Sequence, residues 1–339
     1  MIIQLATTEN QIWEVESFVR DLCVAMDKKQ NIEIDLLKEG PDAEHIGLYK
    51  IIESCAEKYN YNTKNITLRT CNLLEQHSSI QIITENSSHL ISRELKKQYD
   101  HNQPKTNTLY HFGRFIGRSN GPRLYLSEYL YRKYREKTIS TYHYKHNNDY
   151  HRDNIGLEEL VKHFNIADVS DYAKFLSYAP MTIDDIDYTF EKNNHPQELD
   201  FSSRLHQIEK DKFINLYKSF FVEIVSETFY NGNTFFMTEK TFRPILLKTP
   251  FIVQGPINYL KHLQRLGFKT FDQWWDEGYN EDPPSWSIHE ITKVVDYIAS
   301  KTPQELDVIL DEMSSILEHN YQNLLALQKA THWNEFTSR

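Results

Sequence analysis

The chain has 339 residues, of which 40% are hydrophobic and 25% are charged, and its formal net charge is −10. This length allows one large or two medium-sized domains with a substantial core, and the composition is that of a globular rather than a disordered protein. The acidic balance argues against broad nucleic-acid binding, because such binding depends on contacts to phosphate. The three cysteines include no CxxC pair, so they indicate neither a disulfide scaffold nor a zinc site. A reducing compartment is the expected location.

The chain shows no sign of a membrane anchor. Its first residues, MIIQLATTENQIWEVESF, lack the basic start and apolar core of a signal peptide. No apolar run approaches the roughly 20 residues that span a bilayer. We therefore expect a cytoplasmic protein whose contact with a membrane, if any, is peripheral.

Strand and helix patterns alternate through the first half of the chain. Strands are predicted at residues 31–37, 65–71, 79–84, 107–117 and 139–144, and helices at 43–59 and 123–137. This alternation is typical of a parallel α/β sheet. We therefore predict one Rossmann-like domain over residues 1–150.

The pattern weakens over residues 151–198, which we interpret as an interdomain connection with a short helix at 156–166. In the second domain, residues 199–339, strand and helix patterns alternate again. Strands are predicted at 220–227 and 250–255, and helices at 204–220, before residue 247, at 257–267 and in the tail at 304–330. The fold class predicted is α/β, with two Rossmann-like domains facing a cleft and a helical C-terminal tail.

The segment SETFYNGNTFFMTEKTFRPILLKTPFIVQG, residues 226–255, combines a strand end, a polar loop, a Thr-Glu-Lys sequence and a second strand. Helix N-termini beside the carboxyl ends of strands attract anions. Thr238 is expected to cap the helix, and Lys240 and Arg243 would add positive charge for phosphate. Because proline disrupts a helix interior, Pro244 predicts either a helix that begins there or distorted first turns. Solvated charges at an ordinary helix start would give the same pattern.

This segment resembles the donor-binding region of GT-B glycosyltransferases, and in particular of fucosyltransferases. It is most similar to a bacterial and viral fucosyltransferase-like group, in which Thr-Glu-Lys-Thr-Phe is followed by a strand, a glycine turn and a GFKTF element. Here that element is LGFKTFDQWWDEGYN, residues 266–280. The resemblance covers residues 220–280 well and HFGRFIGRSNGPRLYLSEYL, residues 111–130, more loosely.

The resemblance implies a metal-independent GT-B fold enzyme with no cofactor, which uses a nucleotide-sugar, possibly GDP-linked, as co-substrate. Lys240 would neutralise the leaving diphosphate, while Glu239 and Glu227 would lie near sugar or ribose hydroxyls. The basic side chains of Arg114, Arg118 and Arg123 are candidates for phosphate contacts from the other domain. The acceptor would be a glycan or glycolipid of surface polysaccharide synthesis.

An inverting transfer needs a general base at the end of a strand in the first domain. Glu39 and Asp42 follow the first predicted strand, and Glu85 follows the third, so these are the candidate bases. A retaining transfer would not need this base. No Asp-x-Asp metal motif follows a strand, and the acids and histidines of residues 146–154 and 183–187 fit no standard ligand spacing.

Trp274 and Trp275 stand beside acids in DQWWDE, a combination found in sugar sites but also in ordinary cores. Two other functional classes remain open from the sequence. One is a non-catalytic nucleotide- or carbohydrate-binding protein of the same fold, and the other is a transferase that uses a different activated donor. A nucleic-acid-binding role is disfavoured by the acidic charge.

Overall fold

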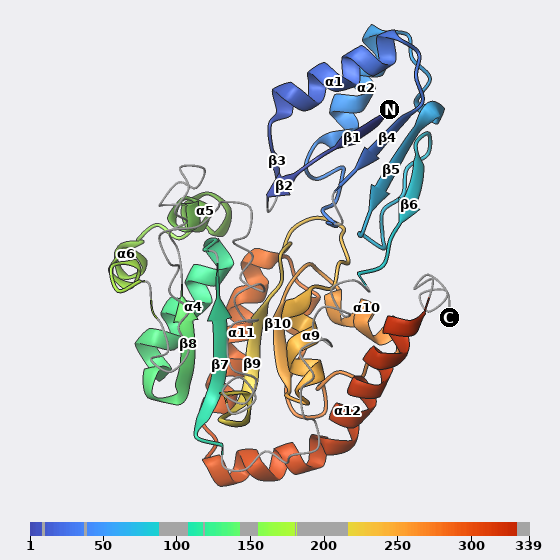
Figure 1. Ribbon diagram of the computed structural model, residues 1–339. Coiled ribbons are helices and arrows are strands. Elements are labelled where there is room, and N and C mark those ends of the chain that lie inside the picture. The colour runs from blue at the N-terminus through green and yellow to red at the C-terminus, as the bar shows by residue number, and fades with distance from the viewer. Residues whose placement is uncertain are drawn as a thin grey trace, which may run out of the picture.

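A computed structural model describes residues 1–8, 11–36, 39–87, 108–117, 119–142, 155–179, 181 and 216–330. These residues form two separate parallel sheets, one in each of two α/β domains (Figure 1). The predicted α/β class with two parallel sheets and a helical tail is therefore confirmed. The long C-terminal helix α12 (Pro303–Lys329) begins with a capping box at Thr302.

The first domain contains four parallel strands in chain order. They are β1 (Ile2–Gln4), β4 (Ile32–Asp35), β5 (Ile66–Thr70) and β6 (Gln81–Thr84); helices α1 (Val15–Asp27) and α2 (Leu48–Lys58) connect them, and β2 (Thr7–Thr8) pairs with β3 (Gln11–Ile12). In β4 and β5 buried residues alternate with partly exposed ones. On the partly exposed face, Arg69 pairs with Glu33 and Glu85.

The predicted strands of this domain are confirmed, whereas β1 and α1 were not predicted. The buried residues of α1 are Phe18, Leu22, Ala25 and Met26, so a helical pattern was present in the sequence. The helix expected at 43–59 begins only at Leu48, because Gly47 has φ 74° and interrupts the helical backbone.

The second sheet has the order β10-β9-β7-β8, with all strands parallel. The strands are β7 (Tyr110–Ile116), β8 (Thr138–Tyr142), β9 (Phe220–Ser226) and β10 (Phe251–Gln254). The chain first runs from β7 outward to β8 and later returns to the other side of β7 as β9. The direction of winding therefore reverses between β7 and β9, where ligands of open α/β sheets bind.

This topology corrects the expected domain boundary at residue 150. The strand at 110–116 pairs with β9, and the strand at 138–142 pairs with that strand, so both belong to the second sheet and not to the first. The first domain thus ends before β7. Local periodicity predicts a strand but not its partner, because strand pairing is a tertiary interaction.

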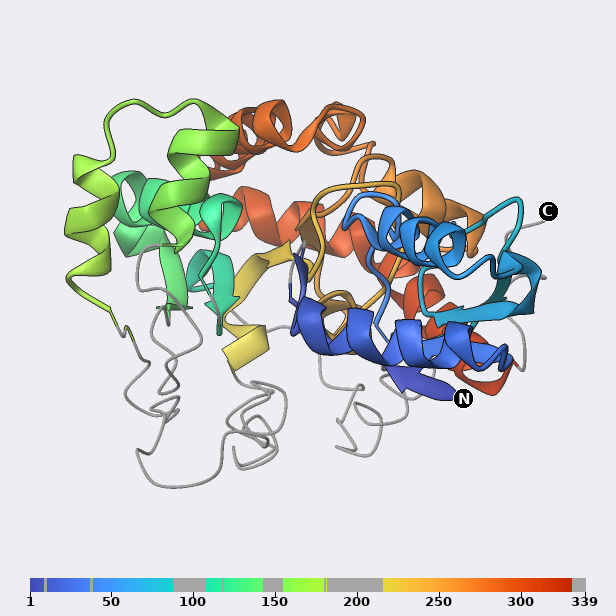
Figure 2. The same cartoon turned by 90° about the horizontal axis from the view of Figure 1, so that it is seen from above.

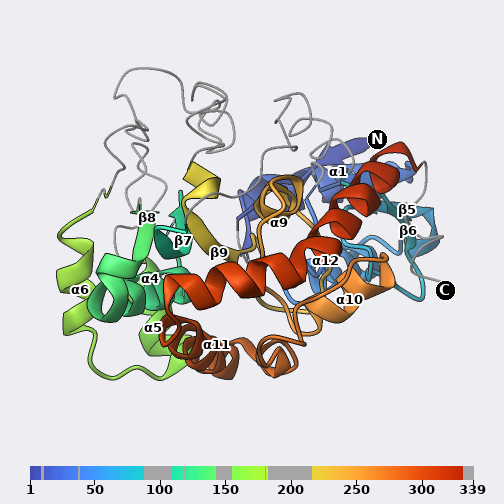
Figure 3. The same cartoon turned by 90° about the horizontal axis from the view of Figure 1, so that it is seen from below.

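Helices cover both faces of the second sheet. They are α4 (Gly121–Tyr134), α9 (Glu239–Leu246), α10 (Tyr259–Arg265) and α11 (Pro284–Ala299), while α5 (Ile155–Phe164) and α6 (Ser170–Leu176) pack on α4. Helices α4 and α11 contact each other, and α9 contacts α12. Figure 3 shows α9 and α11 on opposite sides of the sheet. The helix α11 was not predicted from the sequence.

The two domains meet through the carboxyl-end loops of their sheets. Seen from above, the first domain covers the part of the second that carries α9 and α10, while α5 and α6 lie at the opposite end (Figure 2). The segment after β9 reaches the loops after β4 and β5, where Thr234 donates a hydrogen bond to the carbonyl of Gly40. Phe229 and Phe236 of this segment form a small apolar cluster with Cys71.

Candidate functional site

The candidate site lies at the carboxyl end of β9, beside the reversal point of the second sheet. Helices α4 and α9 and the seven-residue helix α10 begin at this edge. The carboxylate of Glu159 already accepts a hydrogen bond from the first-turn amide of Gly121 in α4, at 2.6 Å. The beginning of α9 is therefore the anion-attracting end to consider first.

Thr238 caps α9 as predicted. Its hydroxyl accepts a hydrogen bond from the amide of Lys240 at 3.3 Å and donates one to the carboxylate of Glu227 at 2.5 Å. The helix continues through Pro244 to Leu246, so it does not begin at the proline. Because Pro244 has no N–H group, the carbonyl of Lys240 lacks its usual helical hydrogen-bond donor. The helix is eight residues long.

Glu227 holds the first turn of α9 in place through hydrogen bonds to its carboxylate. Its side chain is 1% exposed, and its carboxylate accepts hydrogen bonds from the hydroxyls of Thr238, Thr241 and Tyr259. A buried carboxylate needs such donors to offset the loss of water. These contacts occupy the oxygens that sequence analysis assigned to sugar hydroxyls, and they make Glu227 a positioning residue for the first turn of α9.

Lys240 is a partly accessible cation at this edge, with a side chain 23% exposed. Its ammonium group donates to the hydroxyl of Thr228 at 3.1 Å and to the carboxylate of Glu239 at 2.9 Å. The side chain of Glu239 is 10% exposed. A cation held by short-range partners at a helix start presents an oriented donor to an incoming anion.

Arg123 lies on the opposite side of the same strand end. Its guanidinium donates to the carbonyl of Glu227 at 2.8 Å, which ties α4 to the end of β9. Nearby in the sheet register, Gln254 stands beside Ser226. The buried amide group of Gln254 has no hydrogen-bond partner among the described residues. Such groups in native structures call for an explanation, for instance a water or ligand that completes them.

The structure places two further predicted arginines inside the domain and not at its surface. Arg114 is fully buried and donates to the hydroxyl of Ser127 and the carbonyl of Ile224, at 2.8 and 3.1 Å. Burial lowers the pKa of Arg114 to about 9. Arg243 is 1% exposed and lies 4.0 Å from Glu223, where burial raises the pKa of that carboxyl to about 7. Both arginines link core elements in this structure.

The three candidate bases lie in the first domain, each with a partner. Glu39 accepts from the hydroxyl of Thr7 at 2.7 Å, and Asp42 accepts from the amide of Asn233 at 2.6 Å. Glu85 pairs with Arg69 at the end of β6. Asp42 thus contacts the segment that leads to α9, and Glu39 lies three residues before Asp42 in the chain. Glu85, by contrast, follows the edge strand β6.

Asn72 completes the link between the two domains. Its side chain donates to the carbonyl of Asn233 at 3.1 Å and accepts from the amide of Phe235 at 3.0 Å. Sequence analysis did not single out Asn72, Thr228 or Gln254. An asparagine or glutamine after a strand is common, and no local pattern shows which tertiary partner it will meet.

Arg118, a candidate phosphate ligand, lies outside the described residues. The segments 146–154 and 183–187, whose acids and histidines fit no standard metal-ligand spacing, also lie outside them. Within the described part of the chain, no three His, Cys, Asp or Glu side chains are grouped to hold a metal ion. None of the helices described there is long and apolar enough to cross a membrane.

Comparison with known proteins leaves the family unassigned. No protein-family model matches the chain, and no curated protein matches it significantly. A solved structure described as trehalose-6-phosphate from E. coli bound with UDP-2-fluoro glucose is similar over 99% of this chain and 71% of its own, with 10% sequence identity and a TM-score of 0.44. Because this score is below 0.5, this structural similarity carries no functional argument.

Proposed function

We propose that this protein is a GT-B glycosyltransferase that binds a nucleotide-sugar at the start of α9 and transfers the sugar to a glycan hydroxyl. One observation carries the proposal: Lys240 is oriented by Thr228 and Glu239 at a capped helix N-terminus, on the carboxyl edge of a parallel sheet. A diphosphate is the ligand that such a combination of helix dipole and cation favours. The Thr-Glu-Lys-Thr-Phe resemblance supports the same assignment.

The proposed chemical role of Lys240 is to neutralise charge on the departing nucleoside diphosphate. In glycosyl transfer the bond between the sugar carbon and the diphosphate oxygen breaks, and negative charge grows on that oxygen. An ammonium group placed there stabilises the transition state more than the ground state. The Lys240–Glu239 contact of 2.9 Å would loosen as the phosphate replaces the carboxylate, which frees Glu239 for a sugar or ribose hydroxyl.

Neighbouring residues take supporting roles in this proposal. Glu227 and Thr238 hold the first turn of α9 in place through the 2.5 Å hydrogen bond between them. Arg123 fixes the end of β9 and adds positive potential from the α4 side. Arg114 and Arg243, being buried, would act through the fold and not by touching phosphate.

In this proposal the first domain binds the glycan acceptor and supplies the general base. Asp42 and Glu39 are the preferred candidates for the base that deprotonates the acceptor hydroxyl, because the loop that contains them contacts the segment leading to α9. We further propose a cytoplasmic enzyme of surface glycan synthesis, with a GDP-linked donor as the first choice.

A thermal-shift screen of the full chain against GDP, UDP, CMP, dTDP and ADP tests the proposal. A ligand that binds only the native state raises the melting temperature once it exceeds its dissociation constant. We expect one nucleotide to do so, and EDTA to leave the shift unchanged. If no nucleotide raises the melting temperature, the donor site is not at α9. A shift that EDTA removes and manganese restores would instead indicate a metal-dependent enzyme.

A further inference from the structure

A cavity lies on the other face of the sheet from α9. It has a volume of about 480 Å³ and opens between α11 and the segment 274–282. Its walls are formed by Trp274, Trp275, Asp276, Gly278, Tyr279, Asp282, Glu290, Lys293, Val294 and Tyr297. This volume is within the range of small-molecule sites, and no residue of the proposed donor site belongs to the walls.

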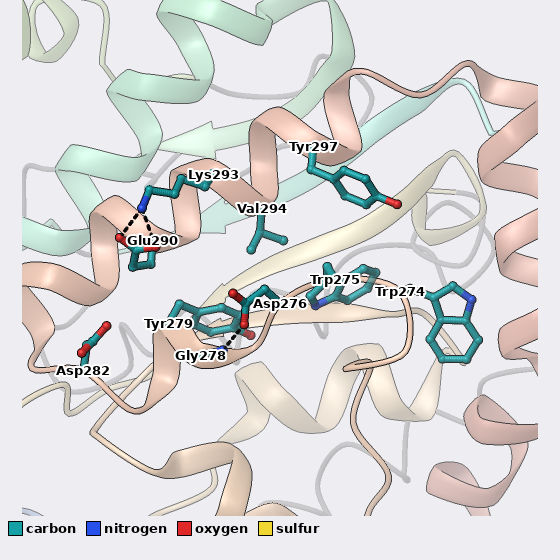
Figure 4. Close-up of a pocket in the computed structure, with 10 residues that line it drawn as sticks. All are labelled: Trp274, Trp275, Asp276, Gly278, Tyr279, Asp282, Glu290, Lys293, Val294 and Tyr297. Atoms are coloured by element: carbon teal, nitrogen blue, oxygen red, sulfur yellow. Dashed lines mark hydrogen bonds and ion pairs between the residues drawn. The ribbon is translucent and has the colours of Figure 1, made fainter.

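Aromatic and acidic side chains both line this cavity. Figure 4 shows the rings of Tyr297 and Trp274 toward one end and the carboxyl groups of Asp282 and Glu290 toward the other. The apolar side chain of Val294 lies between these groups on α11. A ligand that fills the cavity therefore needs an apolar surface at one end and hydrogen-bond donors at the other.

Two aromatic side chains of the cavity, Trp274 and Tyr279, are held in fixed positions. The indole N–H of Trp274 donates to the carboxylate of Glu312 on α12 at 3.0 Å, which fixes the orientation of the ring. Tyr279 is buried, and its hydroxyl accepts a hydrogen bond from the amide of Val253 at 3.4 Å. Side chains that are already ordered lose little conformational entropy when a ligand binds.

The acidic end provides acceptors and repels anions. Glu290 pairs with Lys293 at 2.6 Å, so this lysine is already neutralised. One carboxylate oxygen of Asp276 accepts from the amide of Gly278 at 2.8 Å. The carboxylate of Asp282 has no partner within the described part of the chain. Three acids against one lysine leave a negative wall, which disfavours phosphates and uronic acids.

An exposed stripe on α11 extends the cavity beyond its acidic end. Trp286, Glu290, Lys293 and Tyr297 are spaced by four, three and four residues, so they share one face of the helix. The side chains of Trp286 and Tyr297 are 67% and 44% exposed. The helical rise separates these two residues by about 16 Å, the length of a short chain of linked sugars rather than of a single ring.

We infer that this groove binds a neutral oligosaccharide, at a site separate from the proposed donor site. The C–H face of a sugar ring packs on an aromatic face, where the partial positive charge of the C–H groups meets the negative face of the ring. Its hydroxyl groups donate to Asp276, Asp282 and Glu290. Trp286 binds a sugar unit at one end of the groove, and Tyr297 and Trp274 bind one at the other end.

Isothermal titration of the full chain with size-matched ligands tests this site. The neutral ligands are maltotriose, cellotriose and N,N′,N″-triacetylchitotriose, and the anionic one is trigalacturonate; tetramethylammonium represents a cation. We expect at least one neutral trisaccharide to bind, with trigalacturonate bound at least tenfold more weakly. Failure of all three neutral ligands, or equal binding of trigalacturonate, would overturn the inference, and selective binding of tetramethylammonium would reassign the groove to cations.

Surface variants locate the binding. Trp286→Ala and Tyr297→Ala change exposed side chains and should each weaken the trisaccharide about tenfold, which corresponds to about 1.4 kcal/mol. Tyr178→Ala, with a side chain 47% exposed on the α6 side, is the matched control and should bind as the wild type does. Unchanged binding in both α11 variants would contradict the site. Lys240→Ala should also bind the trisaccharide normally, so that failure of the donor site and failure of this groove give different results.

Discussion

Replacement of Lys240 by alanine is the most direct test of the donor site. The Lys240 ammonium group would exchange its contact with Glu239 for a charge-assisted hydrogen bond to phosphate, worth about 1.5–3 kcal/mol. At about 1.4 kcal/mol per factor of ten, we expect the dissociation constant for the nucleoside diphosphate to rise about 10- to 150-fold. Because the side chain is only 23% exposed, water should screen this interaction only partly.

The fold should survive this substitution. The hydrogen bonds from Thr238 and Tyr259 to Glu227 do not involve the ammonium group of Lys240. We expect the free energy of unfolding to change by less than about 1 kcal/mol, as is typical of partly exposed ion pairs. Circular dichroism and a thermal melt without ligand measure this.

Lys248→Ala provides the matched control. The Lys248 side chain is 25% exposed and forms an ion pair with Glu318 at 2.6 Å, but it follows the other end of α9. Calorimetric titration with the nucleotide found in the screen should give a wild-type constant for Lys248→Ala and a weakened one for Lys240→Ala. Wild-type affinity in Lys240→Ala, or equal losses in both variants, would refute the phosphate role.

Three further predictions concern stability and the domain contact. Burial raises the pKa of the Glu277 carboxyl from 4.5 to about 7. Between these two pH values the folded protein keeps the carboxyl proton, whereas the unfolded chain has released it. The free energy of unfolding therefore falls as the pH rises from about 4.5 to 7. Glu277→Gln should therefore melt like the wild type at pH 4 but be more stable at pH 8, by at most about 3 kcal/mol, and parallel pH profiles would contradict the assignment. Arg114→Met leaves buried acceptors such as Ser226 and the carbonyl of Ile224 unpaired, so thermal melts should show a loss of about 2–5 kcal/mol; a change below 1 kcal/mol would contradict this role. Asn72→Ala should speed amide hydrogen exchange over residues 228–238, whereas Asn62→Ala, which removes a cap far from this contact, should not.

The sequence alone was sufficient to predict the secondary-structure elements whose residues follow a strong local pattern. Alternating residues predicted β4 and β5, and a hydroxyl before Glu-Lys predicted the Thr238 cap, because both depend on neighbours within a few residues. The Thr-Glu-Lys segment also predicted that Lys240 would lie at a helix start near a strand end.

Tertiary structure decided which predicted residues could meet a ligand. Arg114, Arg123 and Arg243 look alike in the sequence as candidates for phosphate binding, yet the structure buries all three, with at most 5% of each residue exposed. Likewise, β7 and β8 belong to the second sheet because β8 pairs with β7, and β7 pairs with β9, which lies more than a hundred residues further along the chain. Burial and strand pairing result from contacts between distant segments, so local sequence patterns do not determine them.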